Sequence, residues 1–441
     1  MTHSKSKIQN PKSSLPRYPR YKDSGIEWLG EIPEHWEVSK TRWLWKEVED
    51  PSENGDEQLL SISQYTGVTP TSAESRSESL VGYRRCKPED LAMNIMLAWQ
   101  GGLGVSDYAG IVSPAYSVFR LRSDNNAHYL GYLYRTKHYL DEFGRHSTGI
   151  VPSRWRLYPD KFGHVLTLLP PKPEQDRIVT FLNQKTAEID ALIAKKQRQI
   201  ELLDEQKSIL INRAVTRGLN PDAKLKPSGI EWIGKIPEHW EVKKLRWLLR
   251  SSVKNGISPP ISEKGRVPTL SIAAVKNGQV TFGENVKFTA IHKSEAASYL
   301  LREGDILALR GNGSRHLVAT AGIVGTDVPE GCIYPDLLIR IQPENLIAPH
   351  YLVIQLNGVL RDGINLAAKT SAGIWKVSGE SLSAQQVLLP PFDEQERILD
   401  YVGSIQQKTA LCKSGITREI QSLKNLRSTL IAHAVTGRIK V

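Results

Sequence analysis

The sequence Ser24–Val38, SGIEWLGEIPEHWEV, occurs again 204 residues later as Ser228–Val242, SGIEWIGKIPEHWEV. Thirteen of the fifteen positions are identical. Two segments this long and this similar do not arise by chance, so we interpret the chain as a tandem duplication. The repeated stretch decides the fold, because two equivalent copies are expected to adopt equivalent structures.

A second block repeats in the same order. The motif Leu-Leu-Pro-Pro, followed by Glu-Gln and Arg-Ile, occupies residues 168–178 and again 388–398, and Ala-Val-Thr follows at 214–216 and 434–436. The segments between these blocks, roughly 45–165 and 249–385, are dissimilar. Two similar frames around two dissimilar inserts predict one task performed on two different targets.

The composition is that of a globular protein. The chain has 441 residues, of which 40% are hydrophobic and 24% charged, enough for two to three domains. No apolar run approaches the roughly 18 residues of a membrane span, so we expect a cytoplasmic protein without a membrane anchor. Cys86, Cys332 and Cys412 are isolated, which argues against disulfides and a structural zinc site. The basic N-terminus lacks the apolar stretch of a signal peptide.

The net charge of +11 favours a polyanionic partner, but it is unevenly distributed. The second insert, 243–390, has 17 basic and 11 acidic residues, whereas the first, 39–170, has 15 of each. To bind a polyanion, a neutral first insert needs its basic and acidic residues on different faces. The sequence permits this, since acidic residues cluster at 47–57 and basic ones at 84–87 and 154–161. For any single charged residue, a place on an ordinary solvent-exposed surface of mixed charge is an equally good interpretation.

Each Leu-Leu-Pro-Pro motif precedes a segment with helical periodicity. From Glu174 to about Arg217 there is no Gly or Pro, and apolar residues recur at steps of three, four and seven. These residues are Ile178, Leu182, Ile189, Leu192, Ile200, Leu203, Leu210 and Ala214. The second copy contains Gly403 and Gly415 and should be less regular. Helices of about 43 residues rarely stand alone in water, so we expect the two to pack antiparallel.

The inserts have short strand-like runs bounded by Gly, Pro and Asn. Strands are expected at 59–63, 116–121, 269–275, 305–310 and 337–341, and helices at 127–140 and 349–360. The fold class is therefore α+β, with two globular α/β domains and two long antiparallel helices in a pseudo-twofold repeat. The expected division is a flexible basic tail 1–23, domain 24–170, long helix 171–217, linker 218–227, domain 228–390 and long helix 391–441.

The motifs give no indication of catalysis. The repeated Pro-Glu-His-Trp-Glu, 33–37 and 237–241, lacks HExxH spacing and a third ligand, so we interpret it as a structural landmark that docks on the long helices. The Gly-rich runs at 100–104 and 311–313 do not continue into a phosphate-binding loop, and the Asn/Asp-Pro-Pro-aromatic signature of adenine methyltransferases is absent. No nuclease carboxylate–lysine cluster is recognisable.

Paired loops precede the two Leu-Leu-Pro-Pro motifs, at Ser147–Ile150 and Ser371–Ile374. Cations follow each, Arg154, Arg156 and Lys161 in one copy and Lys376 in the other. Glycine allows a close backbone approach and the cations neutralise phosphate, so contact with a DNA backbone is one reading; a plain structural turn is an equal one.

Together these features resemble the specificity subunit of a type I restriction–modification enzyme. The resemblance rests on the doubled SGIEW[LI]G.IPEHWEV, the doubled Leu-Pro-Pro…Glu-Gln heading a long helix, the Ala-Val-Thr ending each helix, and the Gly-Ile loops. It spans nearly the whole chain after the tail. Ala372 departs from the family's usual Thr-Gly-Ile in the second loop.

The resemblance implies a non-catalytic subunit that reads a split double-stranded DNA sequence, one half with each target-recognition domain. Two methyltransferase subunits would dock on the helices, and two motor–nuclease (restriction) subunits would join for cleavage. No cofactor would bind this chain; S-adenosylmethionine, ATP and Mg would serve the partners. Arg, Asn and Gln are the expected readers of bases, and Lys the expected phosphate contact. The candidates in the first domain are Arg76, Arg84, Arg85, Gln100, Arg154 and Arg156, and in the second Arg310, Asn312, Arg315, Lys369 and Lys376.

Three alternatives stay open at this point. The chain could be a stand-alone enzyme acting on nucleic acid, a bipartite DNA-binding scaffold outside restriction, or a structural scaffold whose inserts bind proteins. An activity assay on the purified chain separates the first from the others, and salt-dependent DNA binding excludes the last.

Overall fold

The computed structural model describes residues 16–71, 79–371 and 373–441. The chain divides into two compact units, each built from both ends of the duplication. The first unit comprises residues 1–197 and 417–441, and the second comprises 198–416. Each unit therefore contains one insert, the beginning of one long helix and the end of the other.

The two long helices are α5, Lys172–Arg217, and α10, Phe392–Val435, of 46 and 44 residues. Helix α5 ends where Gly218 adopts a φ of +69°, a left-handed conformation in which glycine is favoured. Helix α10 runs unbroken through Gly403 and Gly415, so the expectation of a less regular second helix was wrong. An interior glycine costs only about 1 kcal/mol, which the contacts of α10 with α5 and the two domains offset.

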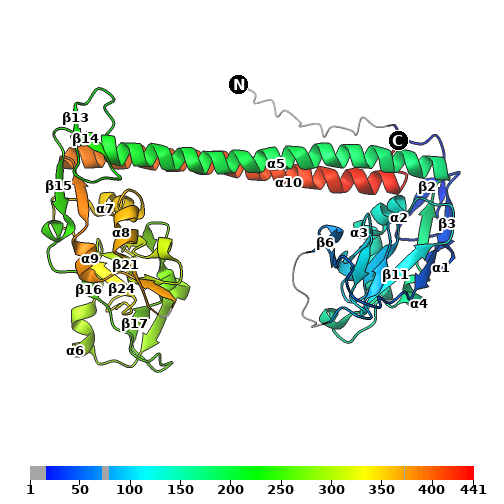
Figure 1. The fold of residues 1–441 in the computed structure, drawn as a ribbon, viewed down its shortest axis with the longest axis horizontal. Coiled ribbons are helices and arrows are strands. Elements are labelled where there is room, and N and C mark those ends of the chain that lie inside the picture. The colour runs from blue at the N-terminus through cyan, green and yellow to red at the C-terminus, as the bar shows by residue number, and fades with distance from the viewer. Residues whose placement is uncertain (1–15, 72–78, 372) are drawn as a thin grey trace, which may run out of the picture. The chain divides into compact units, whose positions relative to one another are not determined.

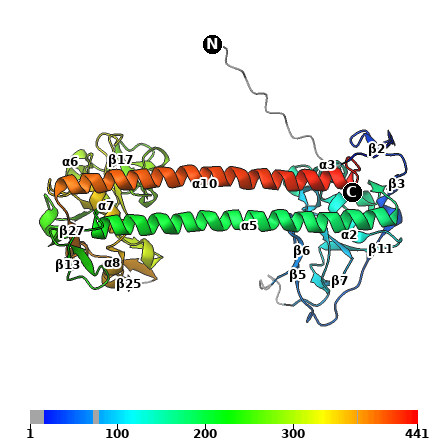
Figure 2. The ribbon, with the colours of Figure 1, turned by 90° about the horizontal axis from the view of Figure 1, so that it is seen from above.

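In each unit the two helices lie side by side and antiparallel (Figures 1 and 2). In the first unit Asp190 pairs with Arg427 at 3.1 Å and Lys196 with Glu419 at 2.6 Å. Residue numbers therefore rise along α5 as the numbers of their partners fall along α10. In the second unit Asp204 pairs with Lys413 at 2.6 Å. The predicted antiparallel packing is confirmed.

The seam between the helices is made of buried and half-buried apolar residues, with Ile420 buried opposite the middle of α5. Ile178, Leu182 and Ile189 are buried in the first unit, and Ile398, Val402 and Ile405 in the second. Leu192, which the periodicity places in the seam, is 46% exposed. Two helices alone cover only one side of each other, so apolar residues elsewhere on the pair remain exposed. These are Leu192, Leu202, Ile209, Leu411 and Leu426.

The first insert folds around a four-stranded antiparallel sheet in the order β4-β11-β8-β9. The strands are β4 Trp45–Val48, β11 Tyr116–Leu121, β8 Leu91–Asn94 and β9 Leu103–Val105. Two smaller antiparallel pairs accompany it: β5 Leu60–Ser63 with β6 Gly67–Pro70, and β7 Arg84–Cys86 with β10 Gly110–Val112.

Three helices complete this domain: α2 Ala127–Tyr134, α3 Lys137–His146 and α4 Pro159–Phe162. The segment 127–140, expected as one helix, is divided because the Thr136 hydroxyl donates to the carbonyl of Leu133 and ends the first helix. The aromatic rings of Tyr134, Tyr139, Phe143 and Phe162 pack edge-on and tilted in the core.

The second insert has a larger sheet of six strands in the order β16-β24-β21-β23-β19-β18, in which only β19 and β23 are parallel among the described pairs. The strands are β16 Lys254–Asn255, β24 Leu338–Ile341, β21 Ile306–Leu309, β23 Ala321–Ile323, β19 Gln279–Val280 and β18 Val275–Lys276. Other elements are the hairpin β17 Val267–Leu270 with β20 Val286–Thr289, and helices α7 Pro349–Asn357 and α8 Arg361–Ala367. The mixed α+β class of both domains is as predicted.

The repeated blocks meet at the root of each insert. Strand β3, Glu37–Lys40, pairs with β12, Leu166–Leu169, and the equivalent β15, Glu241–Lys244, pairs with β27, Gln386–Leu389. The end of the first block and the start of the second are thus neighbouring strands, and each insert begins and ends at one place.

The first block starts earlier than predicted. Strand β1, Tyr21–Asp23, pairs with β2, Glu31–Pro33, as β13, Leu225–Pro227, pairs with β14, Lys235–Pro237. Tyr18 is also buried. The expected flexible tail 1–23 was therefore too long at its C-terminal end, and the linker 218–227 contributes a strand to the second unit. Among the helices described, none is long and apolar enough to cross a membrane.

Candidate nucleic-acid interface

The Glu-Gln pair at the start of each long helix is the joint between helix and domain. In the first unit the Glu174 carboxylate accepts hydrogen bonds from His35 Nε2 (2.8 Å), Trp36 Nε1 (3.1 Å) and the Tyr18 hydroxyl. Burial alone would raise the pKa of Glu174, but these hydrogen bonds outweigh it and the pKa is lowered. The second unit repeats the arrangement, with Glu394 accepting from His239 (2.7 Å) and Trp240 (3.1 Å).

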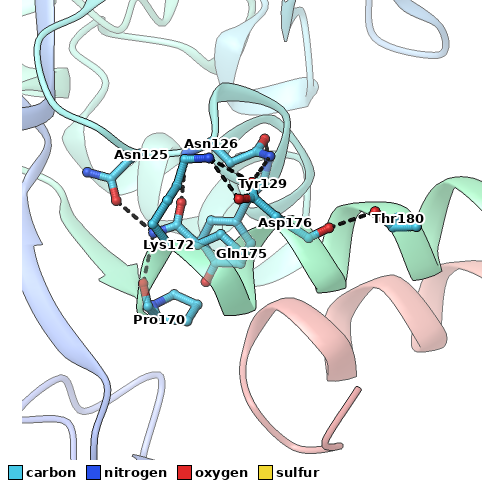
Figure 3. Close-up of polar contacts among 8 residues, drawn as sticks. All are labelled: Asn125, Asn126, Tyr129, Pro170, Lys172, Gln175, Asp176 and Thr180. Carbon is cyan, nitrogen blue, oxygen red and sulfur yellow. Dashed lines mark hydrogen bonds and ion pairs between the residues drawn. The ribbon is translucent and has the colours of Figure 1, made fainter.

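The neighbouring glutamine, Gln175, binds the loop that leads into helix α2 (Figure 3). Gln175 Oε1 accepts from the backbone N–H of Asn126 (2.8 Å), and its Nε2 donates to Pro170 O (2.8 Å) and to Asn125 Oδ1 (2.6 Å). Gln395 bonds Ala348 N, Leu346 O and Pro390 O in the same way. The prediction that Pro-Glu-His-Trp-Glu is a structural landmark docked on the helices is confirmed.

The ends of the helices are exchanged between the copies. The Tyr129 hydroxyl on α2 of the first domain donates to the Val435 carbonyl at the end of α10, at 3.0 Å. The Tyr351 hydroxyl on α7 of the second domain donates to the Val215 carbonyl at the end of α5, at 3.5 Å. Each Ala-Val-Thr motif therefore anchors its helix to the domain of the other copy.

We expect Glu174→Ala to destabilise the first unit by about 3 kcal/mol, because the buried Trp36 N–H loses its acceptor and two further donors lose theirs. Differential scanning calorimetry of the whole chain would show a lower transition for the first unit. Glu205→Ala, on an exposed position of α5, should leave both transitions in place. A transition unchanged by Glu174→Ala would contradict the role of the joint.

The second domain brings its predicted residues together on one small sheet. Strands β22 Gly311–Asn312, β26 Ile374–Lys376 and β25 Lys369–Ser371 lie in that order, so Asn312, Lys369 and Lys376 share this sheet. Arg310 immediately precedes β22, and its carbonyl accepts from Val377 N at 2.9 Å. The Arg315 guanidinium lies over the Trp375 ring, 4.8 Å from its centroid. Ala372 lies outside the described residues.

Two residues of the same cluster, Arg361 and Asn365, were not predicted from the sequence. Arg315 Nε donates to the Asn365 carbonyl (2.9 Å), and Arg361 donates to the His316 carbonyl. Within the described residues, Arg361 Nη1 and Asn365 Oδ1 are buried side-chain atoms without a hydrogen-bond partner. Burial lowers the pKa of Arg361. Unpaired buried polar atoms beside exposed cations fit a surface that is completed by a polar ligand. No local sequence pattern identifies them.

The first domain divides its predicted residues between two places. Gln100 lies in the short 3₁₀ helix η1, Ala98–Gln100, and Arg154 in η2, Pro152–Arg154. Trp99 and Trp155, adjacent to them in sequence, contact each other edge-on with centroids 5.2 Å apart. A backbone bridge joins Arg156 to Thr148 with two 3.0 Å hydrogen bonds. Gln100, Arg154 and Arg156 are thus on neighbouring loops and all are exposed.

The loop 147–156 requires glycine at position 149. A Cβ on Gly149 would lie 2.5 Å from the Arg154 carbonyl oxygen, so no other residue fits there without a shift. The loop presents Ile150 with 96% of its surface exposed. An exposed loop flanked by cations suits a contact with the DNA backbone.

Arg84 and Arg85 occupy the other place, on β7, and they contact the acidic cluster. Arg84 Nη1 is 3.1 Å from Glu47 Oε1, and Arg85 Nε is 2.8 Å from Glu57 Oε1. Hydrogen bonds from Ser52 and Arg85 lower the pKa of Glu57 to about 2. The sequence permitted basic and acidic residues to lie on different faces. For Arg84 and Arg85 this expectation was wrong, because the fold places β7 against the acidic segment. Arg76 lies outside the described residues.

A cleft of about 1140 Å³ opens in the first unit between the domain and α10. Most of the cations that line it already have partners. Lys137 is 2.7 Å from Asp141, Arg427 is paired with Asp190, and Arg135 donates to the carbonyls of residues 64, 65 and 103. The cleft therefore has little free positive charge to offer a phosphate. Among the described residues, no group of three His, Cys, Asp or Glu side chains is placed to hold a metal ion.

Comparison with known proteins identifies the class. Residues 237–422 match the model of the family described as "Type I restriction modification DNA specificity domain". The chain is 26% identical over 336 residues to the type I restriction enzyme EcoKI specificity subunit of Escherichia coli K12, covering 75% of this chain and 68% of that one. It is 27% identical over 291 residues to the MjaVIII specificity subunit of Methanocaldococcus jannaschii, covering 63% and 64%.

A solved structure shares the fold. A chain from a structure of the type I R-M system, published for its complex assembly and conformational transition, matches 92% of this chain and 98% of its own length with a TM-score of 0.66 at 16% identity. This likeness shows that the duplicated frame with two different α+β domains is a fold known from that system. The family model, the curated relatives and the shared fold all support a specificity subunit of a type I restriction–modification enzyme.

Proposed function

We propose that this subunit reads a bipartite double-stranded DNA target, one half with each domain, and scaffolds the modification and restriction subunits. The observation that carries the proposal is the repetition of one joint around two different domains. The Glu174 and Glu394 networks are equivalent, whereas the side chains expected to contact DNA differ between the two domains. Equivalent joints suit two copies of one partner, and different domains suit two different half-sites.

In the second domain the DNA contacts would be Asn312, Arg315, Lys369 and Lys376, with Arg361 and Asn365 completing their hydrogen bonds on DNA. In the first domain they would be Gln100, Arg154 and Arg156. The paired state of Arg84 and Arg85 makes them weaker candidates, because DNA would have to compete with carboxylates already in contact. Base edges in the major groove are the targets of the Asn and Arg side chains.

The partners would be two methyltransferase and two restriction subunits. Exposed apolar residues along the helix pair, among them Leu202 and Leu411, support docking on the helices, since a partner helix would cover them. The chain itself would be non-catalytic and bind no cofactor, while the partners would use S-adenosylmethionine, ATP and Mg. The complex would act in the cytoplasm, where DNA is accessible.

The purified chain should neither methylate nor cut DNA. With a cognate methyltransferase subunit and S-adenosylmethionine, it should direct adenine methylation to a split sequence, which sequencing of methylated bases would show. Methyl transfer by the chain alone would support the stand-alone enzyme instead. Absence of salt-dependent DNA binding by the assembled complex would support the protein scaffold.

Single substitutions on the β22-β26-β25 sheet should have distinct effects. Lys376→Ala should weaken binding to all sequences and reduce the slope of log affinity against log salt by about 1, as expected for one lost phosphate contact. Asn312→Ala should cost about 1–3 kcal/mol, and only for the second half-site. Fluorescence anisotropy with matched and half-site-altered duplexes separates these effects. Lys287→Ala, on β20 of another sheet, is the control and should change neither measurement.

A further inference from the structure

A single exposed turn is repeated at the root of both domains. In the first unit it is the helix α1, Thr41–Leu44, and in the second the 3₁₀ helix η3, Leu245–Leu248. Helix α1 directly follows strand β3, and η3 directly follows the equivalent strand β15. The N–H of residue 41 donates to the Val165 carbonyl (2.9 Å), and the N–H of residue 245 donates to the Gln385 carbonyl (2.8 Å). The two turns are therefore held to equivalent positions of their frames.

Each turn buries its first and last residues and exposes the two between them. Leu44 and Leu248 are buried, as are the residues that open the turns. Trp43 is 62% exposed and Trp247 is 69% exposed. An indole is among the largest apolar side chains, and leaving it in water forgoes the free energy of its burial. Its exposure at both equivalent positions indicates a surface that is completed by another molecule.

An arginine accompanies each tryptophan. The Arg42 guanidinium lies 5.1 Å from the centroid of the Trp43 ring, and the Arg246 guanidinium lies 5.9 Å from that of Trp247. The surrounding sequence is basic, with no acidic residue in 38–46 or in 242–250. The further cations in these segments are Lys40 and Lys46 in the first, and Lys243, Lys244 and Arg250 in the second. Lys243 is partnered by Glu241, and the others leave both turns positively charged.

We infer that these two turns are equivalent docking points for two copies of one protein partner whose contact face is acidic. Tryptophan and arginine are the residues that most often dominate binding energy between proteins. A DNA duplex offers phosphates and base edges but keeps its base faces stacked, so it has no surface for an indole to stack on. A protein pocket lined with carboxylates satisfies both the ring and the arginine.

The inference rests on the proposed function, which supplies a partner in two copies, the methyltransferase subunit. It adds that docking is not confined to the long helices, because α1 and η3 lie at the roots of the domains. One copy of the partner would contact Trp43 and the other would contact Trp247. Each turn would thereby link the partner to the domain that chooses the half-site.

The test is the number of methyltransferase subunits bound. Native mass spectrometry of the full chain with excess cognate methyltransferase subunit should show two copies on the wild type, one on Trp43→Ala, one on Trp247→Ala and none on the double variant. Each substitution should weaken its site by roughly 30-fold or more, as expected for the loss of an interface tryptophan. Phe288→Ala, which removes an exposed aromatic ring on β20 that has no repeated equivalent, should keep two copies.

The circular dichroism spectrum and the DNA affinity of the free double variant should equal those of the wild type. A double variant that still binds two subunits with unchanged affinity overturns the inference and leaves the proposed function standing. Loss of DNA affinity with two subunits retained overturns it as well, because the turns would then contact DNA. A wild-type chain that binds no methyltransferase subunit overturns the proposed function, and the inference with it.

Discussion

Replacing residues 45–165 with the corresponding insert of another specificity subunit should rewrite one half of the DNA target and leave the other half unchanged. The structure provides the boundary for this exchange. Residue 45 begins β4, which pairs with β11 inside the insert, and residue 165 directly precedes β12, which pairs with β3 in the frame. Both cuts thus lie at one root, and no strand pair between frame and insert is divided.

The expected change is large. Each mismatched base pair costs about 1–3 kcal/mol, so loss of a half-site of several base pairs should reduce methylation of the original target by more than roughly 100-fold. The donor insert must supply a tyrosine equivalent to Tyr129, which binds the end of α10, and a loop equivalent to Asn125–Asn126, which binds Gln175. A donor that lacks these groups should give an unstable first unit rather than a new target.

Mapping of methylated adenines across a genome measures both halves at once. The reciprocal exchange of residues 249–385 is the matched control and should change the other half alone. A change in both halves after either exchange would show that the domains do not read independently.

Duplicating Thr186-Ala187-Glu188-Ile189 in α5 should lengthen the unread spacer between the half-sites by one or two base pairs while both half-sites keep their sequence. The unit lies inside the unbroken helix α5. Four residues add about 6 Å of helix and turn the distal part by roughly 40° beyond a full turn, so the same face of α5 continues to meet α10. Base pairs are spaced about 3.4 Å apart, which sets the expected change.

The cost of the insertion falls on the helix pair. With α10 unchanged, the contacts Asp190–Arg427 in the first unit and Asp204–Lys413 in the second cannot all keep their register. These pairs are about half exposed or less and contribute little each, so the complex should survive with reduced affinity. A second four-residue insertion in α10 directly after Arg427, opposite the first insertion, should restore the register of these pairs and the affinity. The DNA must also absorb the added twist, at some cost in affinity.

Methylation mapping of the insertion variants tests whether the length of the helices sets the spacer between the half-sites. A two-residue insertion at the same place is the matched control, because it rotates the distal helix by about 200° and should abolish methylation. An active four-residue variant with the original spacer would show that the helices do not set the distance.

The recognition surfaces were only partly predictable. In the second domain, Gly-Asn and the Gly-Ile-Trp-Lys loop lie more than 60 residues apart, and their union in the β22-β26-β25 sheet depends on strand pairing that no local pattern encodes. Arg361 and Asn365 were missed for the same reason. In the first domain, Arg84 and Arg85 were predicted as exposed readers, but their charges are compensated by Glu47 and Glu57. Residue type and local charge do not reveal which partner a side chain will meet.

The sequence by itself determined the duplication, the joint, the helices and the family. These features are either local or repeated: a helical period is a property of neighbouring residues, and comparing the copies reveals the frame without any structure. Only the tertiary structure decided that each unit is built from both copies, with Val435 bound to Tyr129 and Val215 to Tyr351. It also decided that Leu192 is exposed, and that Trp43 and Trp247 are exposed. The physical reason is that burial and pairing between residues distant in the chain depend on which surfaces meet when the chain closes, and periodicity specifies a face without specifying what covers it.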